Sequence, residues 1–223
     1  MFKDKELILF DFDGTLIDSG PDLSLALNDM LTQLGRDTFT QEIIHTWVGN
    51  GAQTLVKRAL LGQSDISAAI NNTYFENALK IFLASYEKNV CVDTLLYPNV
   101  KEMLVGLQRR GFRLAIITNK PYKFIMPILK GLGIENYFEL LLGGDSLAVK
   151  KPKPEPLLHV CKELCVDISR SLMVGDSKND ILAAQAANIE SIGVSYGYNY
   201  GEHISKYKPD VVIDDIKKIL ELV

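Results

Sequence analysis

The sequence predicts an α/β protein, a Rossmann-like parallel-sheet core that carries an inserted cap of four helices. Two observations lead to this fold class. From Tyr97 onward, short and almost continuously apolar runs alternate with helical patterns, which is typical of a parallel sheet covered on both faces. Residues 21–88 instead show helical periodicity throughout, and they follow a first apolar run at 7–10 that belongs with the sheet.

The helical segment is predicted to contain four helices. The first begins at Pro21, where the missing N–H costs no hydrogen bond, and ends at Gly35. A second is expected after Thr40, a third after the Gly49-Asn50-Gly51 break, and a long fourth from about Asp65 to Lys88. We therefore expect a catalytic core domain of residues 1–20 and 89–223 and a cap domain of residues 21–88.

The second half of the chain supplies the other elements of the core. The apolar runs expected to form strands are 113–117, 140–142, 172–174, 191–194 and 211–213. Helices are expected at 98–111, from Pro121, at 154–164, at 181–187 and after the last strand. Pro127 falls inside the helix that begins at Pro121, and we expect it to kink that helix.

Composition and charge argue against several classes of protein. The 223 residues carry a net charge of −4, and the only dense basic cluster, at 150–153, is too short for a nucleic-acid surface. Charged residues near the start argue against a secretory signal, and no apolar run is long enough to span a bilayer. The three cysteines form no disulfide framework. We expect a cytoplasmic protein, monomer or homodimer, with no nucleic-acid or membrane partner.

A pair of acids ends the first apolar run. Asp11 and Asp13 share one face of a continuing strand, and Gly14 lets the backbone turn after them. Like charges this close disfavour joint ionisation, and a divalent cation such as Mg²⁺, which prefers oxygen ligands, removes that cost. A carboxylate facing a phosphate there can act as a nucleophile. Taken alone, the motif is equally typical of a solvated turn after a strand.

Three further polar clusters lie near the ends of predicted strands. Thr118-Asn119-Lys120 follows Ile117, residues 150–154 precede a helix, and residues 175–180 follow Val174. Each has a structural explanation, as a helix cap or a solvated turn. Because ligands of open α/β sheets bind beyond the carboxyl ends of the strands, four such clusters on one edge favour a common site.

Together these residues meet the needs of phosphoryl transfer. In this interpretation Asp11 attacks phosphorus, while Asp13 protonates the leaving oxygen and later deprotonates water. Asp176 completes a Mg²⁺ site with Asp11 and the main-chain carbonyl of Asp13, and Asp180 orients Lys151 or metal-bound water. The residues expected to contact the phosphate are Gly14, Thr118, Asn119 and Lys151.

These motifs resemble those of the haloacid dehalogenase-like hydrolase superfamily, and the match covers essentially the whole chain. The matching segments are D-F-D-G-T-L-I-D-S at 11–19, T-N-K at 118–120, K-P-K-P at 151–154 and G-D-S-K-N-D at 175–180. Within the superfamily the chain looks most like the bacterial phosphoglycolate phosphatase family, on segments 18–23, 49–60, 143–146 and 193–199. This resemblance implies a Mg²⁺-dependent phosphatase of carbohydrate metabolism. It would hydrolyse 2-phosphoglycolate to glycolate and phosphate through an aspartyl-phosphate.

The cap is expected to supply specificity, because the core motifs contact only the phosphate. The turn at Gly49-Asn50-Gly51 is a candidate to reach over the site. Lys57 and Arg58 are candidates to bind a substrate carboxylate, for which Arg suits a bidentate contact. The alternative is that both are solvated on an exposed helix face.

The expected partner is a small phosphorylated metabolite, but other functions remain open at this point. Another small phosphomonoester or sugar-phosphate phosphatase, or a phosphomutase, would keep every core residue. A dehalogenase needs no metal and no acid at Asp13, so Asp13 and Asp176 argue against it. A phospho-accepting signalling module collects similar residues but is usually shorter and lacks the insertion. A purely structural role leaves the assembled acids without a purpose.

Overall fold

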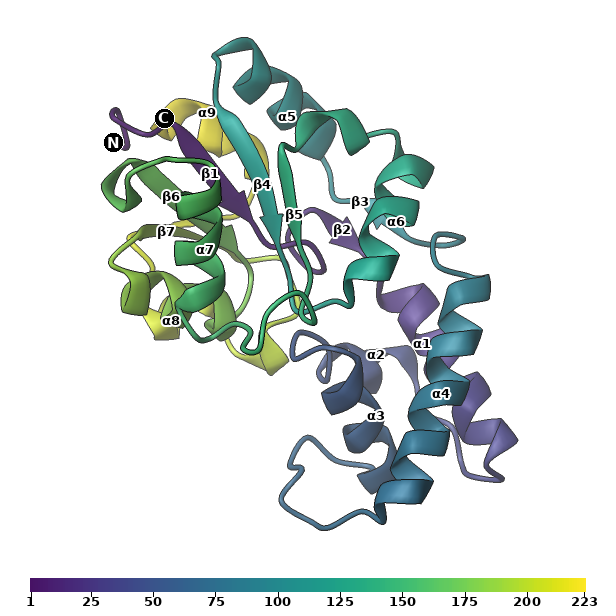
Figure 1. The fold of residues 1–223 in the computed structure, drawn as a ribbon. Coiled ribbons are helices and arrows are strands. Elements are labelled where there is room, and N and C mark those ends of the chain that lie inside the picture. The colour runs from purple at the N-terminus through teal and green to yellow at the C-terminus, as the bar shows by residue number, and fades with distance from the viewer.

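The computed structural model describes residues 1–223, and its centre is a six-stranded parallel sheet (Figure 1). Its strands are β1 (Leu7–Phe10), β4 (Arg113–Ile117), β5 (Leu140–Leu142), β6 (Ser171–Gly175), β7 (Glu190–Val194) and β8 (Val211–Ile213). Their order across the sheet is β5-β4-β1-β6-β7-β8, and every neighbouring pair is parallel. The predicted α/β, Rossmann-like class is confirmed.

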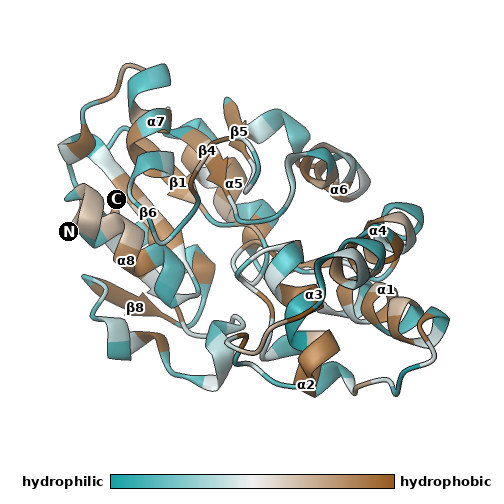
Figure 2. Ribbon diagram, turned by 60° about the horizontal axis from the view of Figure 1, so that its bottom comes forward, coloured by the Kyte–Doolittle hydropathy of each residue, from teal (hydrophilic) through white to brown (hydrophobic).

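Helices cover both faces of the sheet, because alternate residues of its strands point to opposite sides. Ile8 and Phe10 of β1 pack with one cluster, which includes α5 (Val100–Arg109), α6 (Ile125–Leu132) and α9 (Ile219–Leu222). Leu7 and Leu9 pack with the other, which includes α7 (Glu155–Glu163) and α8 (Lys178–Ala187). Figure 2 shows hydrophobic residues concentrated along these central strands. Burial on both faces explains why the strands are continuous apolar runs.

The strand order places a binding crevice at the end of β1. From β1 the chain builds outward through β4 and β5, then crosses to the other side of β1 with β6 and continues through β7 and β8. Such a switch in direction opens a crevice at the carboxyl ends of the two strands that flank it, here β1 and β6. In Figure 1 the arrows of β1 and β4 point toward the helices between β2 and β3.

Those helices form a separate packed unit. They are α1 (Gly20–Gln33), α2 (Gln41–His45), α3 (Ala52–Leu61) and α4 (Asn72–Lys88). Their apolar faces enclose a cluster of their own around Leu27, Trp47 and Phe82, and Phe124 is the only fully buried member from outside the unit. This separate cluster supports the predicted cap at 21–88, although the exact domain boundaries remain a prediction. No helix in the structure is both long enough and apolar enough to cross a membrane.

Two local predictions are wrong, and one small sheet was not predicted. The fourth helix begins at Asn72 and not near Asp65, because the Asp65 carboxylate accepts hydrogen bonds from Ser67 and so stabilises a turn. Pro127 lies in the first turn of α6, where its missing N–H costs no hydrogen bond, and not in a helix interior. The antiparallel pair β2 (Ile17–Asp18) and β3 (Leu95–Leu96) was not predicted, since two-residue strands carry no periodic signal.

A buried carboxylate joins the two connections between cap and core. Asp22, in the first turn of α1, is fully buried. It accepts hydrogen bonds from the main-chain N–H groups of Val92, Asp93 and Thr94 at 2.9–3.2 Å, and from the Thr94 hydroxyl at 2.7 Å. The start of the cap is thereby tied to the segment that returns to the core.

Replacing Asp22 is expected to destabilise the protein, because several buried N–H donors would lose their acceptor. Asp22→Ala should lower the free energy of unfolding by about 3 kcal/mol. Denaturant unfolding measures this, with Asp29→Ala as the control, since Asp29 is an exposed acid on the same helix. Equal, small effects of the two substitutions would contradict the structural role of Asp22.

Candidate active site

The two acids after β1 lie at the crevice. The Asp11 main-chain N–H continues the ladder by donating to Val174 of β6. The backbone turns at Gly14, which has a φ of +89°, and a Cβ added there would collide with the Asp176 carboxylate. Glycine is therefore required for both the turn and the close approach of Asp176.

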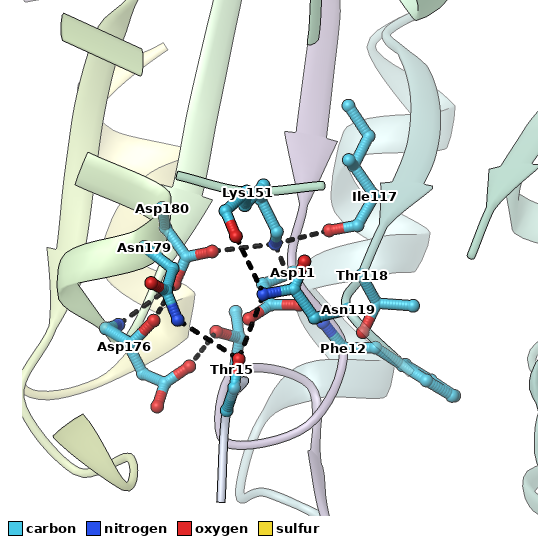
Figure 3. A network of polar contacts seen from close by, with 12 residues as sticks. Asp11, Phe12, Thr15, Ile117, Thr118, Asn119, Lys151, Asp176, Asn179 and Asp180 are labelled. Atoms are coloured by element: carbon cyan, nitrogen blue, oxygen red, sulfur yellow. Dashed lines mark hydrogen bonds and ion pairs between the residues drawn. The ribbon is translucent and has the colours of Figure 1, made fainter. Parts of the chain in front are cut away.

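Lys151 is the centre of the site (Figure 3). The residue is 2% exposed, and its Nζ lies 3.0 Å from Asp11 Oδ1, 2.7 Å from Asp180 Oδ1 and 2.5 Å from the Ile117 carbonyl. Three oxygens thus surround a group with three N–H donors. Burial opposes the charge, but the two carboxylates raise the pKa of Lys151 above its ordinary value, so it remains an ammonium.

Asp180 is held rigidly while it contacts Lys151. Its other oxygen, Oδ2, accepts hydrogen bonds from the main-chain N–H and the hydroxyl of Ser177, at 2.9 and 2.8 Å. This pair caps the start of α8. That Asp180 orients Lys151 or metal-bound water during the reaction stays a prediction.

Three buried carboxylates form a cluster that suits a divalent cation. Each of Asp11, Asp176 and Asp180 offers an oxygen within 4.8 Å of the others. Burial, with the charge of Asp180 adding to it, raises the pKa of Asp176 to about 7 and also raises that of Asp11. One ammonium balances only one of the three negative charges, and hard oxygen ligands of this kind fit Mg²⁺.

Asp176 is aimed by two contacts from different segments. The Thr15 hydroxyl donates to its Oδ1 at 3.0 Å, and the Tyr198 main-chain N–H donates to its Oδ2 at 2.8 Å. The Tyr198 hydroxyl donates in turn to Asp18 at 2.6 Å, in the connection to the cap. Asp176 and the cap connection are therefore both contacted by one residue, Tyr198.

Asp13 has one occupied and one free oxygen. Its Oδ1 accepts from the Ser19 hydroxyl at 2.5 Å and from Lys120 Nζ at 2.8 Å, whereas Oδ2 has no donor. Asp11 is similar, since the Phe12 N–H at 2.7 Å and Lys151 both contact its Oδ1. Each acid is thus held through one oxygen and presents the other to a ligand.

The residues after β4 contact both the core and the cap. Thr118 is buried, and its hydroxyl accepts from the Lys120 N–H at 3.1 Å. The Asn119 amide donates to the carbonyls of Lys151 at 3.1 Å and of Gly49 in the cap at 3.0 Å. Asn179 also donates to the Gly49 carbonyl, at 3.1 Å, and Lys150 Nζ donates to the Asn50 carbonyl at 2.6 Å. The cap turn at 49–51 therefore rests directly on the edge of the sheet.

A small pocket of about 40 Å³ lies between this edge and the cap. Asp11, Asp13, Thr118 and Asn119 line its core side. Its cap side is largely apolar, and the residues that line it there include Leu23, Val48, Gly49, Gly51, Ala52, Leu55, Phe82 and Tyr86. The pocket thus joins a highly charged end to an apolar one.

The structure does not bring Lys57 and Arg58 to this pocket. The Arg58 guanidinium donates to the carbonyls of Trp47 at 2.6 Å and Ser64 at 3.1 Å, and Lys57 Nζ lies 5.0 Å from the centre of the Phe75 ring. Neither residue lines the pocket, so the structure lends no support to their predicted contact with substrate, which stays a prediction.

Sequence reasoning missed several residues of the site. Lys120, Thr15 and Ser19 contact the acids directly, yet none was assigned a role. All three lie within the two motifs already singled out, so proximity to an acid in sequence was the available signal. Tyr198 and Asn179 had no such signal for their contacts with the cap.

Comparison with known proteins gives the family. A family model described as haloacid dehalogenase-like hydrolase matches residues 8–194. The chain belongs to the haloacid dehalogenase-like hydrolase family. Similar proteins named phosphoglycolate phosphatase include one from Colwellia psychrerythraea, 55% identical over 98% of this chain and 96% of the relative. Another, from Psychrobacter arcticus, is 46% identical over 98% and 95%.

A solved structure shows the same fold at high similarity. The crystal structure of a predicted phosphoglycolate phosphatase from Haemophilus somnus superposes with a TM-score of 0.92, with 40% identity and 98% of each chain covered. This family member thus shares the arrangement of sheet and helices along essentially its whole length.

The raised pKa of Asp176 predicts a pH dependence for the metal-free protein. Because the folded state holds a proton on Asp176 up to about pH 7, whereas the ordinary value is 3.8, the folded state binds more protons between these limits. The free energy of unfolding should therefore fall as pH rises from about 4 to about 7. Unfolding in chelator at pH 5 and pH 8 measures this.

Two controls accompany this measurement. Asp176→Asn should flatten the pH dependence, since the titrating carboxyl is removed. Adding Mg²⁺ should stabilise the protein more at pH 8 than at pH 5, because ligands must be deprotonated. Stability in chelator that rises from pH 5 to pH 8 would contradict the buried, protonated carboxyl.

Proposed function

We propose that this chain is a Mg²⁺-dependent phosphoglycolate phosphatase, which hydrolyses 2-phosphoglycolate to glycolate and phosphate. The observation that carries the phosphatase chemistry is the contact of Lys151 with Asp11 beside the buried carboxylate cluster. This arrangement brings a nucleophile (Asp11), a fixed positive charge (the Lys151 ammonium) and a site for a metal ion together in one crevice. The substrate rests on the relatives of that name, which match nearly the full chain.

The first half-reaction transfers the phosphoryl group to Asp11. The free Oδ2 of Asp11 attacks phosphorus, the bond to the glycolate oxygen breaks, and that oxygen takes a proton from Oδ2 of Asp13. In the second half-reaction the Asp13 carboxylate removes a proton from water as the water attacks phosphorus. The bond between phosphorus and Asp11 then breaks, and phosphate is released.

The other residues bind and orient. The Thr118 hydroxyl and Asn119, which line the pocket, and the backbone at Gly14 would contact phosphate oxygens. Lys151, bound to Asp11, would supply positive charge beside the phosphate and could contact it by exchanging one of its protein partners. Asp11, Asp176 and the Asp13 carbonyl would hold Mg²⁺, which neutralises charge on the phosphate. Lys151 and Asp180 keep Asp11 in place, and the cap turn at 49–51 covers the pocket and excludes water.

Substrate and metal are tested together by phosphate release from a panel of small phosphomonoesters. We expect a strong preference for 2-phosphoglycolate and loss of activity in chelator, restored by Mg²⁺. Broad activity on sugar phosphates would keep the chemistry but contradict the substrate. Full activity in chelator would contradict the metal requirement.

Substitution of the two acids separates their roles. Asp11→Asn should abolish turnover, because the amide is not a nucleophile, while the thermal unfolding temperature shows that the fold survives. Asp13→Asn should slow turnover by about 10²-fold to 10⁴-fold, the usual contribution of general acid–base catalysis. Near-normal steady-state turnover in Asp13→Asn would rule out its role in proton transfer. Asp29→Asn, on the exposed face of α1, serves as the control.

A further inference from the structure

One buried lysine that lines the pocket, Lys120, has no role in the proposed mechanism. Lys120 follows β4, is 4% exposed and lines the pocket. Its Nζ lies 2.8 Å from Asp13 Oδ1 and 4.8 Å from the centre of the Tyr86 ring. It therefore lies next to the acid proposed to protonate the leaving oxygen.

The donors of Lys120 are incompletely used. An ammonium has three N–H donors, and Asp13 is the only oxygen that accepts from this one. Lys151, equally buried, has three oxygens around its nitrogen. Burial with unused donors is costly, so Lys120 has both the capacity and the energetic reason to bind a further anion.

A second unpartnered group lies on the cap side of the same pocket. Tyr86 of α4 is 1% exposed, yet its hydroxyl has no hydrogen-bond partner. Buried hydroxyls are nearly always bonded, and one that is not calls for an explanation. Burial raises the pKa of Tyr86 to about 12, so the group remains a donor at neutral pH.

The apolar end of the pocket offers no other group that could pair with an anion. Leu23, Leu55, Phe82 and Phe124 are apolar, and among the residues that line the pocket Lys120 is the only cation. Arg58 and Lys57, the candidates that the sequence offered, do not line the pocket. An apolar wall strengthens any charge pair formed against it.

We propose that Lys120 of the core and the Tyr86 hydroxyl of the cap together bind the carboxylate of the substrate. This inference rests on the proposed function, because in 2-phosphoglycolate the carboxyl carbon is only two bonds from the ester oxygen that leaves. A cation in contact with Asp13 is therefore within reach of that carboxylate. Because one group comes from the core and one from the cap, a carboxylate-bearing substrate also joins the two.

The test compares two esters that differ only at this group. 2-Phosphoglycolate carries a carboxylate where 2-hydroxyethyl phosphate carries a neutral CH₂OH. For Lys120→Met, kcat/KM should fall about 100-fold more for 2-phosphoglycolate than for the neutral ester, and for Tyr86→Phe about 10-fold more. A substitution that only disturbs Asp13 lowers kcat/KM equally for the two esters. Such a loss cancels in the ratio of the two kcat/KM values.

Controls address charge and folding. Lys120→Arg should retain most of the preference, and Lys123→Met should leave it unchanged, since Lys123 is an exposed lysine of the same segment paired with Glu87. Tyr86→Phe removes only a hydroxyl with no protein partner, so it should fold normally even if Lys120→Met does not.

The outcomes separate this proposal from the function it rests on. If the unsubstituted protein prefers 2-phosphoglycolate and both substitutions reduce that preference, the carboxylate site is supported. If the preference is present but survives both substitutions, the site is overturned while the function stands. If the unsubstituted protein shows no preference between the two esters, the proposed substrate fails and the carboxylate site with it.

Discussion

The buried ammonium of Lys151 is the contact on which the site depends. It draws Asp11 from the end of β1, Asp180 from the start of α8 and the last carbonyl of β4 to one point. Without it, three buried carboxylates would face one another with no internal counter-charge, an arrangement that costs several kcal/mol. The same ammonium leaves the cluster short of positive charge, so the arrangement that stabilises the fold also creates the demand for a cation.

Core and cap meet through groups that also contact residues of the candidate site. Asn119 contacts the carbonyl of Lys151 as well as that of Gly49, and Tyr198 contacts both Asp176 and the connection at Asp18. The position of the cap and the alignment of the acids are therefore not independent. A displacement of the turn at 49–51 removes contacts from residues that touch the catalytic centre.

The sequence predicted the sheet and the charged end of the site well, for a physical reason. Strands buried on both faces must be continuous apolar runs, and the residues that follow them must gather at one edge. Asp11, Asp13, Thr118, Lys151 and Asp176 lie there. The Lys120 pair with Asp13 spans 107 positions, and the placement of Tyr86 depends on how α4 packs against α1 and α3 in the cap. The periodicity of nearby residues encodes neither the pairing of Lys120 with Asp13 nor the position of Tyr86. Arg58 shows the converse, since a charge that looks available in sequence is bound by carbonyls that only the folded cap brings near.

The turn at 49–51 rests on the core through exchangeable contacts. These are four hydrogen bonds: Asn119 and Asn179 donate to the Gly49 carbonyl, Lys150 donates to the Asn50 carbonyl, and the Asn50 amide donates to Asn179. Water replaces such bonds at a net cost of about 1 kcal/mol each, so breaking all four costs about 4 kcal/mol. That energy corresponds to an open fraction of the turn on the order of 0.1%. A lid with this balance spends most of its time shut over the reacting groups, yet it releases its contents by an ordinary thermal fluctuation. The rate of that fluctuation then sets an upper limit on how fast the enzyme can turn over.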